Sequence, residues 1–106
     1  SSATLATTDV IQACPVNKGD VIVGGVFKVL RVASAGATNT ITVQVGSTAI
    51  SAAIDCLTLG STKIGTAVPL PVTANDTVDF LLTGTTNPVF DALVEVTLFV
   101  EPTSRA

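Results

Sequence analysis

Hydrophobic and polar positions alternate with a period of two along most of the chain. Short runs rich in Val, Ile, Thr, Leu and Phe are separated by Gly, Asn, Asp and Pro, and no segment shows the spacing of an amphipathic helix. Because successive side chains of a strand point to opposite faces, this pattern predicts β-strands. The expected strands cover residues 8–14, 20–32, 39–46, 48–55, 65–70, 77–83 and 91–101.

Turn-forming residues mark the ends of these runs. Pro15 removes a backbone donor, and Asn17 and Gly19 favour a turn. The pair Gly24–Gly25 inside a long run predicts a bulge or a sharp bend, and Gly46–Ala49 predicts a tight hairpin. About seven to eight short strands with regular turns indicate an all-β fold, an antiparallel β-sandwich or a jelly-roll-like barrel.

The chain fits one domain. Residues 1–7 are rich in Ser, Thr and Ala, and we expect them to form a flexible N-terminal arm. The β-sandwich domain is expected over residues 8–101, followed by a C-terminal tail at 102–106.

The last predicted strand separates its side chains cleanly into two faces. One face holds only aliphatic residues: Ala92, Val94, Val96, Leu98 and Val100. The opposite face is polar but includes Leu93 and Phe99, and Leu81 takes the corresponding outward position in the strand before it. We therefore expect Leu81, Leu93 and Phe99 to contact a second subunit. The alternative is that these are isolated exposed apolar side chains, which are normal in monomers.

The composition favours a protein that is covered by partners. Hydrophobic residues make up 47% of the 106 residues and charged residues only 12%, about half the usual share of about 25%. The net charge is −3, and five scattered basic residues give no footprint for nucleic acid. The most apolar run, residues 21–32, contains Lys28 and Arg31 and is too short to span a membrane, so no membrane partner is expected.

Few residues suggest chemistry. The chain has no His, so Ser–His and Cys–His catalytic pairs are excluded, as is a His-containing zinc site. Cys14 and Cys56 are far apart in the chain and have no CxxC partner. We expect them to be free, buried thiols, and a disulfide between them is the alternative. No catalytic, cofactor or metal residue is predicted.

Asp76 and Asp79 are the one carboxylate pair that suggests a site. Residues three apart on a strand point to opposite faces, so the two carboxylates cannot share a metal ion or a proton. Asn75–Asp76 is typical of a turn, and Asp79 is expected on the outer face toward water. A calcium loop needs about six oxygen ligands, which this segment does not supply.

The order of these patterns resembles that of a known class of proteins. Thr7 to Gly36, "TTDVIQACPVNKGDVIVGGVFKVLRVASAG", is followed by "TITVQVGSTAISAAIDC", "VTANDTVDFLLTG" and "DALVEVTLFVEP". This succession resembles small bacteriophage virion proteins that decorate or cement the capsid. The likeness extends from about Thr8 to Glu101 and consists of strand patterns and turns.

The resemblance implies a structural role on the virion. Such proteins typically form homotrimers at local threefold positions on the outer capsid surface, after assembly in the host cytoplasm. They bridge neighbouring copies of the major capsid protein and perform no reaction. The alternative is a receptor- or glycan-binding β-domain of a phage head fibre or tail. The absence of Trp and Tyr argues against this alternative, because stacking platforms for sugars are scarce.

Overall fold

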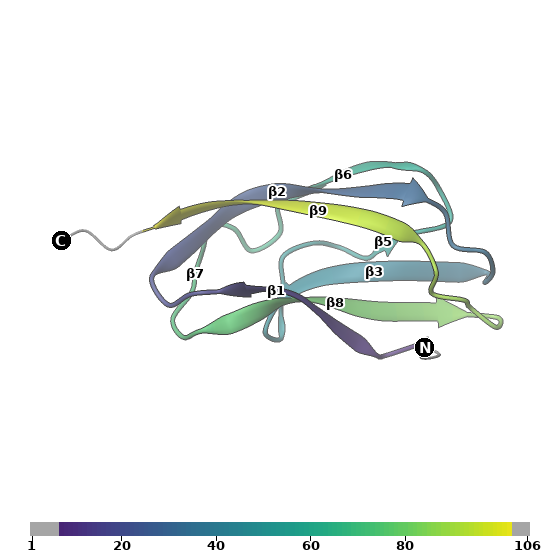
Figure 1. Ribbon diagram of the computed structural model, residues 1–106, viewed down its shortest axis with the longest axis horizontal. Helices are drawn as coiled ribbons and strands as arrows, with labels where there is room; N and C mark the ends of the chain where they lie inside the picture. The colour runs from purple at the N-terminus through teal and green to yellow at the C-terminus, as the bar shows by residue number, and fades with distance from the viewer. Residues whose placement is uncertain (1–6, 103–106) are drawn as a thin grey trace.

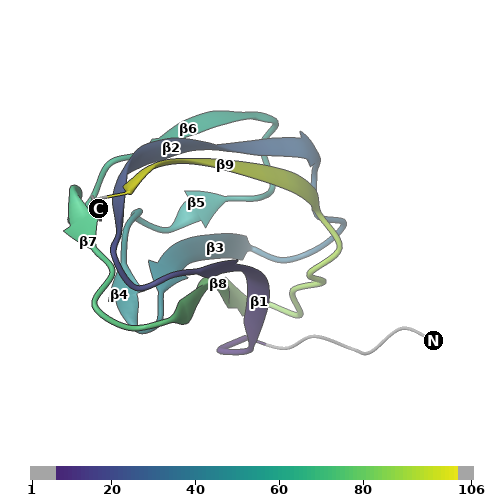
Figure 2. The ribbon, with the colours of Figure 1, turned by 60° about the vertical axis from the view of Figure 1, so that its left-hand side comes forward.

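The computed structural model describes residues 7–102 and contains no helix in that range. The chain forms two antiparallel sheets that pack face to face (Figure 1, Figure 2). In chain order the strands are β1 (Val10–Val16), β2 (Asp20–Arg31), β3 (Thr38–Val45), β4 (Thr48–Ala49), β5 (Ile54–Asp55), β6 (Gly60–Ile64), β7 (Leu70–Pro71), β8 (Asp76–Thr85) and β9 (Leu93–Pro102).

The first sheet has the order β1–β8–β3, with β4 and β5 pairing with β3. Since β8 pairs along the whole of β3, the short strands β4 and β5 share the other edge of β3. The second sheet is centred on β2. Strand β9 pairs along the whole of β2, so β6 and β7 share its opposite edge. Among residues 7–102 no strand of one sheet pairs with the other, which confirms the antiparallel β-sandwich.

Alternation along the strands builds the core. In β3 every second side chain, from Asn39 to Val45, is buried between the sheets. Phe27 of β2 meets Phe80 of β8 edge to face, with ring centroids 5.8 Å apart. Such pairs add about 1 kcal/mol to the stabilisation from burial alone. These two rings join the central strands of the two sheets.

Two expected strands are wrong. The expected strand 48–55 is divided into β4 and β5 by residues 50–53, which belong to no strand. The Ile50 N–H donates to the Val43 carbonyl, and the Ser51 Oγ accepts from the Val43 N–H. The expected strand 65–70 is also misplaced: β6 ends at Ile64, and the next strand, β7, comprises only Leu70 and Pro71.

The two predicted turn features are confirmed. The β3–β4 hairpin has a two-residue loop, Gly46–Ser47, in which Gly46 adopts a φ of 59°. The ladder between β2 and β9 shifts register between Ile22 and Gly24, as expected for a bulge at the paired glycines. At Gly25 a side chain would collide with the carbonyl oxygen of Thr97, so the backbone of β9 lies unusually close to β2 at this point.

Candidate interaction surface

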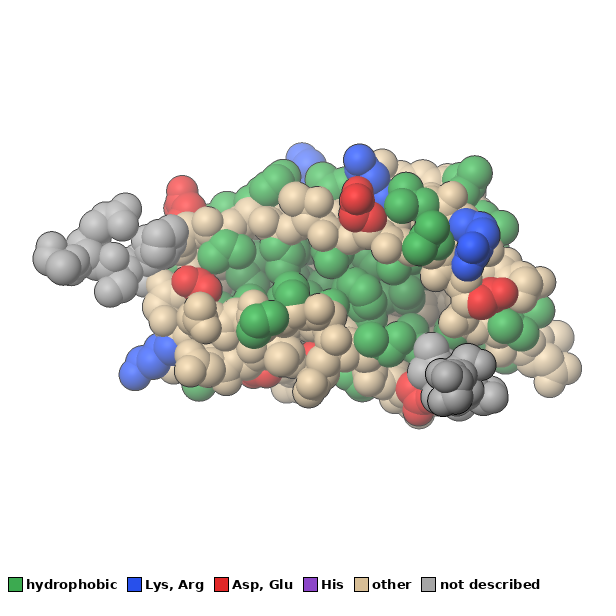
Figure 3. Space-filling model, viewed as in Figure 1, with side chains coloured by type: hydrophobic (Ala, Val, Ile, Leu, Met, Phe, Trp, Pro, Cys, Tyr) green, Lys and Arg blue, Asp and Glu red, His purple; other side chains and the backbone are tan. Residues whose placement is uncertain are grey.

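One flank of the sandwich is open. Strands β1 and β9 end their sheets on the same side, and both lie at the front in Figure 1. Between them lies a cleft of about 260 Å³. The space-filling view shows a band of hydrophobic side chains recessed between two rims (Figure 3). The flank therefore exposes part of the apolar interior.

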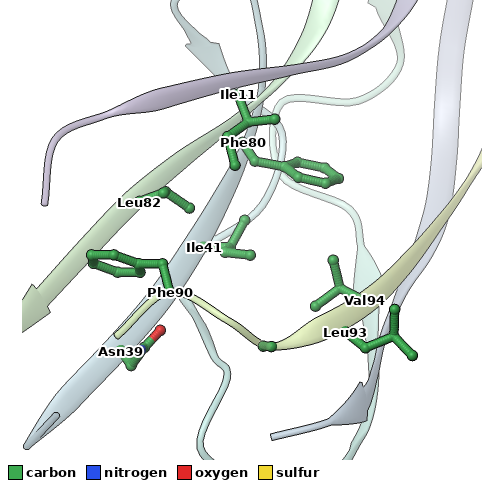
Figure 4. Close-up of a pocket in the computed structure, with 9 residues that line it drawn as sticks. Ile11, Asn39, Ile41, Phe80, Leu82, Phe90, Leu93 and Val94 are labelled. Carbon is green, nitrogen blue, oxygen red and sulfur yellow. The ribbon is translucent and has the colours of Figure 1, made fainter. Parts of the chain in front are cut away.

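The cleft is lined by side chains from both sheets and from the loop before β9 (Figure 4). Ile11 of β1 and Phe80 and Leu82 of β8 line one wall, because all three occupy inward positions of their strands. Val94 of β9 contributes to the opposite wall, and Phe90 lies at one end. The remaining lining residues are Asn39, Ile41, Ala92 and Leu93.

The polar group in the cleft is already satisfied. Asn39 is 1% exposed, and its amide nitrogen donates to the carbonyls of Ala35 and Val89 at 3.1 and 2.8 Å. These bonds connect the loop between β2 and β3 to the loop between β8 and β9. Because the donors of Asn39 are occupied, the cleft offers apolar contact rather than polar recognition.

Asp91 fixes the start of β9. Its Oδ1 accepts a 2.8 Å hydrogen bond from the Ser34 N–H, and its carbonyl accepts one from the Arg31 guanidinium at 3.2 Å. The Ser34 bonds, assisted by the positive charge of Arg31, hold the pKa of the Asp91 carboxyl below its ordinary value of 3.8. The segment just before β9 is thus anchored to the end of β2 and to the loop that follows β2.

Strand β9 keeps the predicted alternation but buries less than expected. Ala92, Val94, Val96 and Leu98 face the core and are only half-buried. Val100, which we expected in the core, is 39% exposed. On the other face Leu93 and Phe99 are 50% and 52% exposed. The inward face of β9 is incompletely covered because nothing in the described chain lies beyond the free edge of the strand.

A second hollow lies on the outer face of the β2 sheet. It measures about 360 Å³ and is lined by the bulge at Gly24–Gly25, by Phe99 and by neighbouring aliphatic side chains of Val23, Val26 and Val68. The bulge forms its floor because glycines project no side chain there. Phe99 therefore belongs to an apolar hollow as well as to β9.

The three predicted contact residues do not form one patch. Leu93 and Phe99 share the outer face of β9. Leu81 lies in β8, in the other sheet, opposite Val10 and Thr42 on that sheet's outer face. It is half-buried, so it offers less surface than the other two. Leu93 and Phe99 therefore share a face to which Leu81 does not belong.

The carboxylates of the β8 segment divide as strand geometry requires. Asp76 is the first residue of β8 rather than part of the turn, and its Oδ1 accepts from the Thr77 N–H at 2.8 Å. The turn residue Asn75 accepts from the Lys18 N–H at 2.8 Å.

The expectation that Asp79 faces water is wrong. It is 8% exposed, lies between Gln12 of β1 and Gln44 of β3, and accepts a 2.6 Å bond from the Thr77 hydroxyl. Side chains on the two strands that flank β8 bury it although it is on the outer face. In the described range no three His, Cys, Asp or Glu residues are grouped to hold a metal ion.

Both cysteines are free thiols. Cys56 is fully buried, as expected, and burial with the nearby Asp55 carboxylate raises its pKa to about 11. Cys14 is exposed on β1, so the expectation that it is buried is wrong. The bulge between Gln12 and Cys14 interrupts the alternation of β1, which the sequence did not signal.

The expected arm and tail lie mostly outside the described residues. Thr7, the last residue of the expected arm, is described, and its hydroxyl accepts from the Gly84 N–H at 3.1 Å. The structure therefore ties the chain to β8 one residue earlier than the expected start of the domain. Across residues 7–102 there is no helix of the length and apolar character needed to span a membrane.

Comparisons with protein-family models, with curated proteins and with solved structures gave no significant match to this chain. The candidate interaction surface is therefore described by the cleft and the exposed side chains of this chain alone. Sequence reasoning found Leu93 and Phe99 but missed Ile11, Asn39 and Phe90. Ile11, Asn39 and Phe90 are far apart in sequence, and they line one cleft only because β1 and β9 are the edge strands on the same side.

Proposed function

We propose that this chain is a structural virion protein that decorates and cements the outer surface of a bacteriophage capsid. It acts by burying apolar surface against the major capsid protein and against other copies of itself. The observations that support an interaction role are the open flank, which Leu93 lines, and the exposed Phe99 at the second hollow. The location on the capsid rests on the sequence resemblance described above.

Exposed apolar patches larger than a few hundred Å² are rare in soluble monomers and mark interaction sites. Here a cleft that opens onto the core adjoins a strand with a free edge, and a second apolar hollow lies behind Phe99. Covering these surfaces at a junction between shell subunits would remove them from water and hold the neighbours together. The proposal assigns the chain no reaction.

Binding to capsid shells tests this function. Shells of the encoding phage that lack the chain are mixed with the purified protein, and sedimentation measures the bound fraction. Phe99→Lys should weaken binding or self-association, whereas Thr83→Lys, on the exposed outer face of the other sheet, should not. Cryo-electron microscopy of the decorated shells should place the protein across junctions between shell subunits. Failure to bind shells, with binding to a host glycan instead, would contradict the proposal.

A further inference from the structure

Strand β9 has nearly the same pattern when read in either direction from Val96. Large apolar Leu93 and Phe99 stand three residues on either side of it, on the outer face. Val94 and Leu98 stand two residues away on the inner face, and polar Glu95 and Thr97 are its neighbours. When a strand of this kind pairs antiparallel with its own copy, apolar residues lie opposite apolar residues and polar residues lie opposite polar residues.

The edge of β9 that faces away from β2 is available for such a pair. Within residues 7–102, β2 is the only strand paired with β9. An antiparallel ladder uses the backbone groups of alternate residues, so the intervening N–H and C=O groups of β9 point outward. Neither proline nor a lysine interrupts this edge between Leu93 and Glu101. A long, regular edge of this kind is a template for adding a strand.

We propose that β9 pairs antiparallel with β9 of a second copy about a twofold axis at Val96. In this register Leu93 lies opposite the partner's Phe99, and this apolar contact occurs twice on the outer face. Val94 lies opposite the partner's Leu98 on the inner face, and Glu95 lies opposite the partner's Thr97. The two four-stranded sheets then become one continuous sheet across the pair.

Charge and side-chain orientation select this register. Shifting the axis to Glu95 places two carboxylates directly opposite each other, which is destabilising. Shifting it to Thr97 places Glu95 opposite Phe99 and Glu101 opposite Leu93, so both apolar contacts are lost. A register in between sets inner-face residues against outer-face residues, which the two cores do not allow. The axis at Val96 keeps apolar residues together and carboxylates apart.

The same pairing covers the open flank. Val94 and Ala92 line the cleft of one copy. Opposite them stand the partner's Leu98 and the partner's Val100, whose side chains point to the same inner side. Val100 is exposed in the single chain and becomes enclosed in the pair. A second copy therefore supplies the cover that the half-buried inner face of β9 lacks.

This inference rests on the part of the proposed function that makes the chain self-associating, and it is independent of the location on a capsid. It replaces the threefold contact implied by the resemblance. A ring of three needs two different surfaces in head-to-tail contact, whereas a strand that matches itself forms an isologous, twofold contact.

A cysteine placed on the axis tests the register. In a Cys14→Ser background, Val96→Cys brings the two introduced thiols opposite each other. Opposed residues have Cα atoms about 4.5–5.5 Å apart, within the range of a disulfide. The control, Val94→Cys, separates the thiols by about four residues, or roughly 13 Å. Mild oxidation should give mostly covalent dimer for Val96→Cys and at least tenfold less for Val94→Cys. Equal cross-linking of the two variants would overturn the proposal.

A charge exchange on the outer face provides a second test, read as mass in solution. Leu93→Glu and Phe99→Lys should each weaken dimerisation at least tenfold, because a charge then faces an apolar side chain twice per dimer. The double variant should recover dimerisation, because the introduced carboxylate and ammonium groups then face each other across the axis. Both sites are half exposed, and circular dichroism checks that each variant is folded.

The mass of the unmodified protein completes the test. A mass of two chains is expected at micromolar concentration. A trimer, or a monomer at every concentration, would overturn the β9 pairing. If a monomer still binds capsid shells, only the pairing fails. If a dimer forms but does not bind shells, only the proposed location on the capsid fails.

Discussion

The two flanks of the sandwich bury the same kinds of side chain to different extents. On the flank formed by β4, β5 and the loops around them, the closed flank, Ile50 and Cys56 are 0% exposed and Ile54 is 5% exposed. On the open flank between β1 and β9, Ile11 and Val94 are only half-buried although they point to the same interior.

The difference comes from how the chain reaches each flank. Residues 46–60 leave β3 and lead toward β6, and along the way they bond to segments of both sheets. The Cys56 N–H donates to the Asn39 carbonyl in β3, and the Cys56 carbonyl accepts from the Ala33 N–H just after β2. No described segment makes such a bridge between β1 and β9. A core closes where the chain itself crosses it and remains open where two sheet edges face each other.

The two edges of the open flank also differ. Strand β1 has a bulge between Gln12 and Cys14 and a proline at position 15, both of which discourage pairing with another strand. Strand β9 has a regular edge from Leu93 to Glu101. Protection of one edge alone directs association to the other. This asymmetry is why the proposed dimer uses β9.

The largest expected difference between the two flanks is the loss of stability when one isoleucine on each is truncated to alanine. Ile50→Ala on the closed flank should lower the free energy of unfolding by about 3–4 kcal/mol, because a fully buried side chain leaves a cavity. Ile11→Ala on the open flank should cost about 1 kcal/mol, because the side chain is already partly in water. Denaturant unfolding at one fixed protein concentration measures both values. Equal costs would show that the open flank is as well covered as the closed one.

A smaller effect is expected where β9 is attached to β2. In Gly25→Ala the added methyl group would collide with the Thr97 carbonyl oxygen and lie 2.9 Å from a Leu98 methyl carbon. Relief requires β9 to move, at a cost of about 2 kcal/mol. Gly65→Ala is the matched control, because no atom lies within 4 Å of its added carbon, and its effect should stay within about 0.5 kcal/mol. Comparable losses in the two variants would show that β9 does not rely on close contact at Gly25.

Much of the strand pattern could be predicted from the sequence because it depends on local alternation. The runs that became β2, β3, β8 and β9 are long and keep a period of two, so their positions were predicted within a few residues. The region from Ile50 to Pro71 was predicted poorly. Its short strands are set by hydrogen bonds to residues distant in sequence, such as the donation from the Cys56 N–H to Asn39 and from the Ala33 N–H to Cys56, which no local pattern encodes.

The candidate site was only partly predictable for the same reason. Alternation identified Leu93 and Phe99 as outward apolar residues of β9. The cleft depends on β9 and β1 being the edges on one side, which is a property of sheet order. Asp79 shows the limit clearly: its face was predicted correctly, but its burial results from Gln12 and Gln44 on the neighbouring strands.

Each flank holds one titratable group that makes stability depend on pH. Cys56 on the closed flank should reduce stability at alkaline pH, and Asp91 at the open flank should reduce it at acidic pH. On the closed flank the pKa of Cys56 is raised to about 11 in the folded protein. The Cys56 thiol ionises more readily in the unfolded chain than in the folded one. The stability that the neutral, buried thiol contributes is therefore fully present below about pH 9 and is lost as pH rises toward 11. At pH 10 the loss should be about 1 kcal/mol.

Unfolding of the protein at pH 7 and pH 10, compared with the Cys56→Ala variant, measures this loss. The variant starts from lower stability but should lack the extra decrease at pH 10. An identical decrease in both proteins would exclude Cys56 as its source.

At the end of the open flank Asp91 should give the smallest effect, at acidic pH. Its folded-state pKa is lowered, mainly by the bond from the Ser34 N–H. The carboxylate therefore stabilises the fold above its ordinary value of 3.8, and this contribution is lost as pH falls through the lowered pKa. Asp91→Asn should shift the urea midpoint slightly downward at pH 6, and this difference from the parent should shrink as pH falls below 3.8. Because Asp91 anchors the start of β9, the same variant should also speed hydrogen exchange at Leu93 and Val94 at pH 6 and not at Ile54. An exchange increase shared equally by the two flanks would show that this anchor acts on the whole sandwich rather than on the free edge.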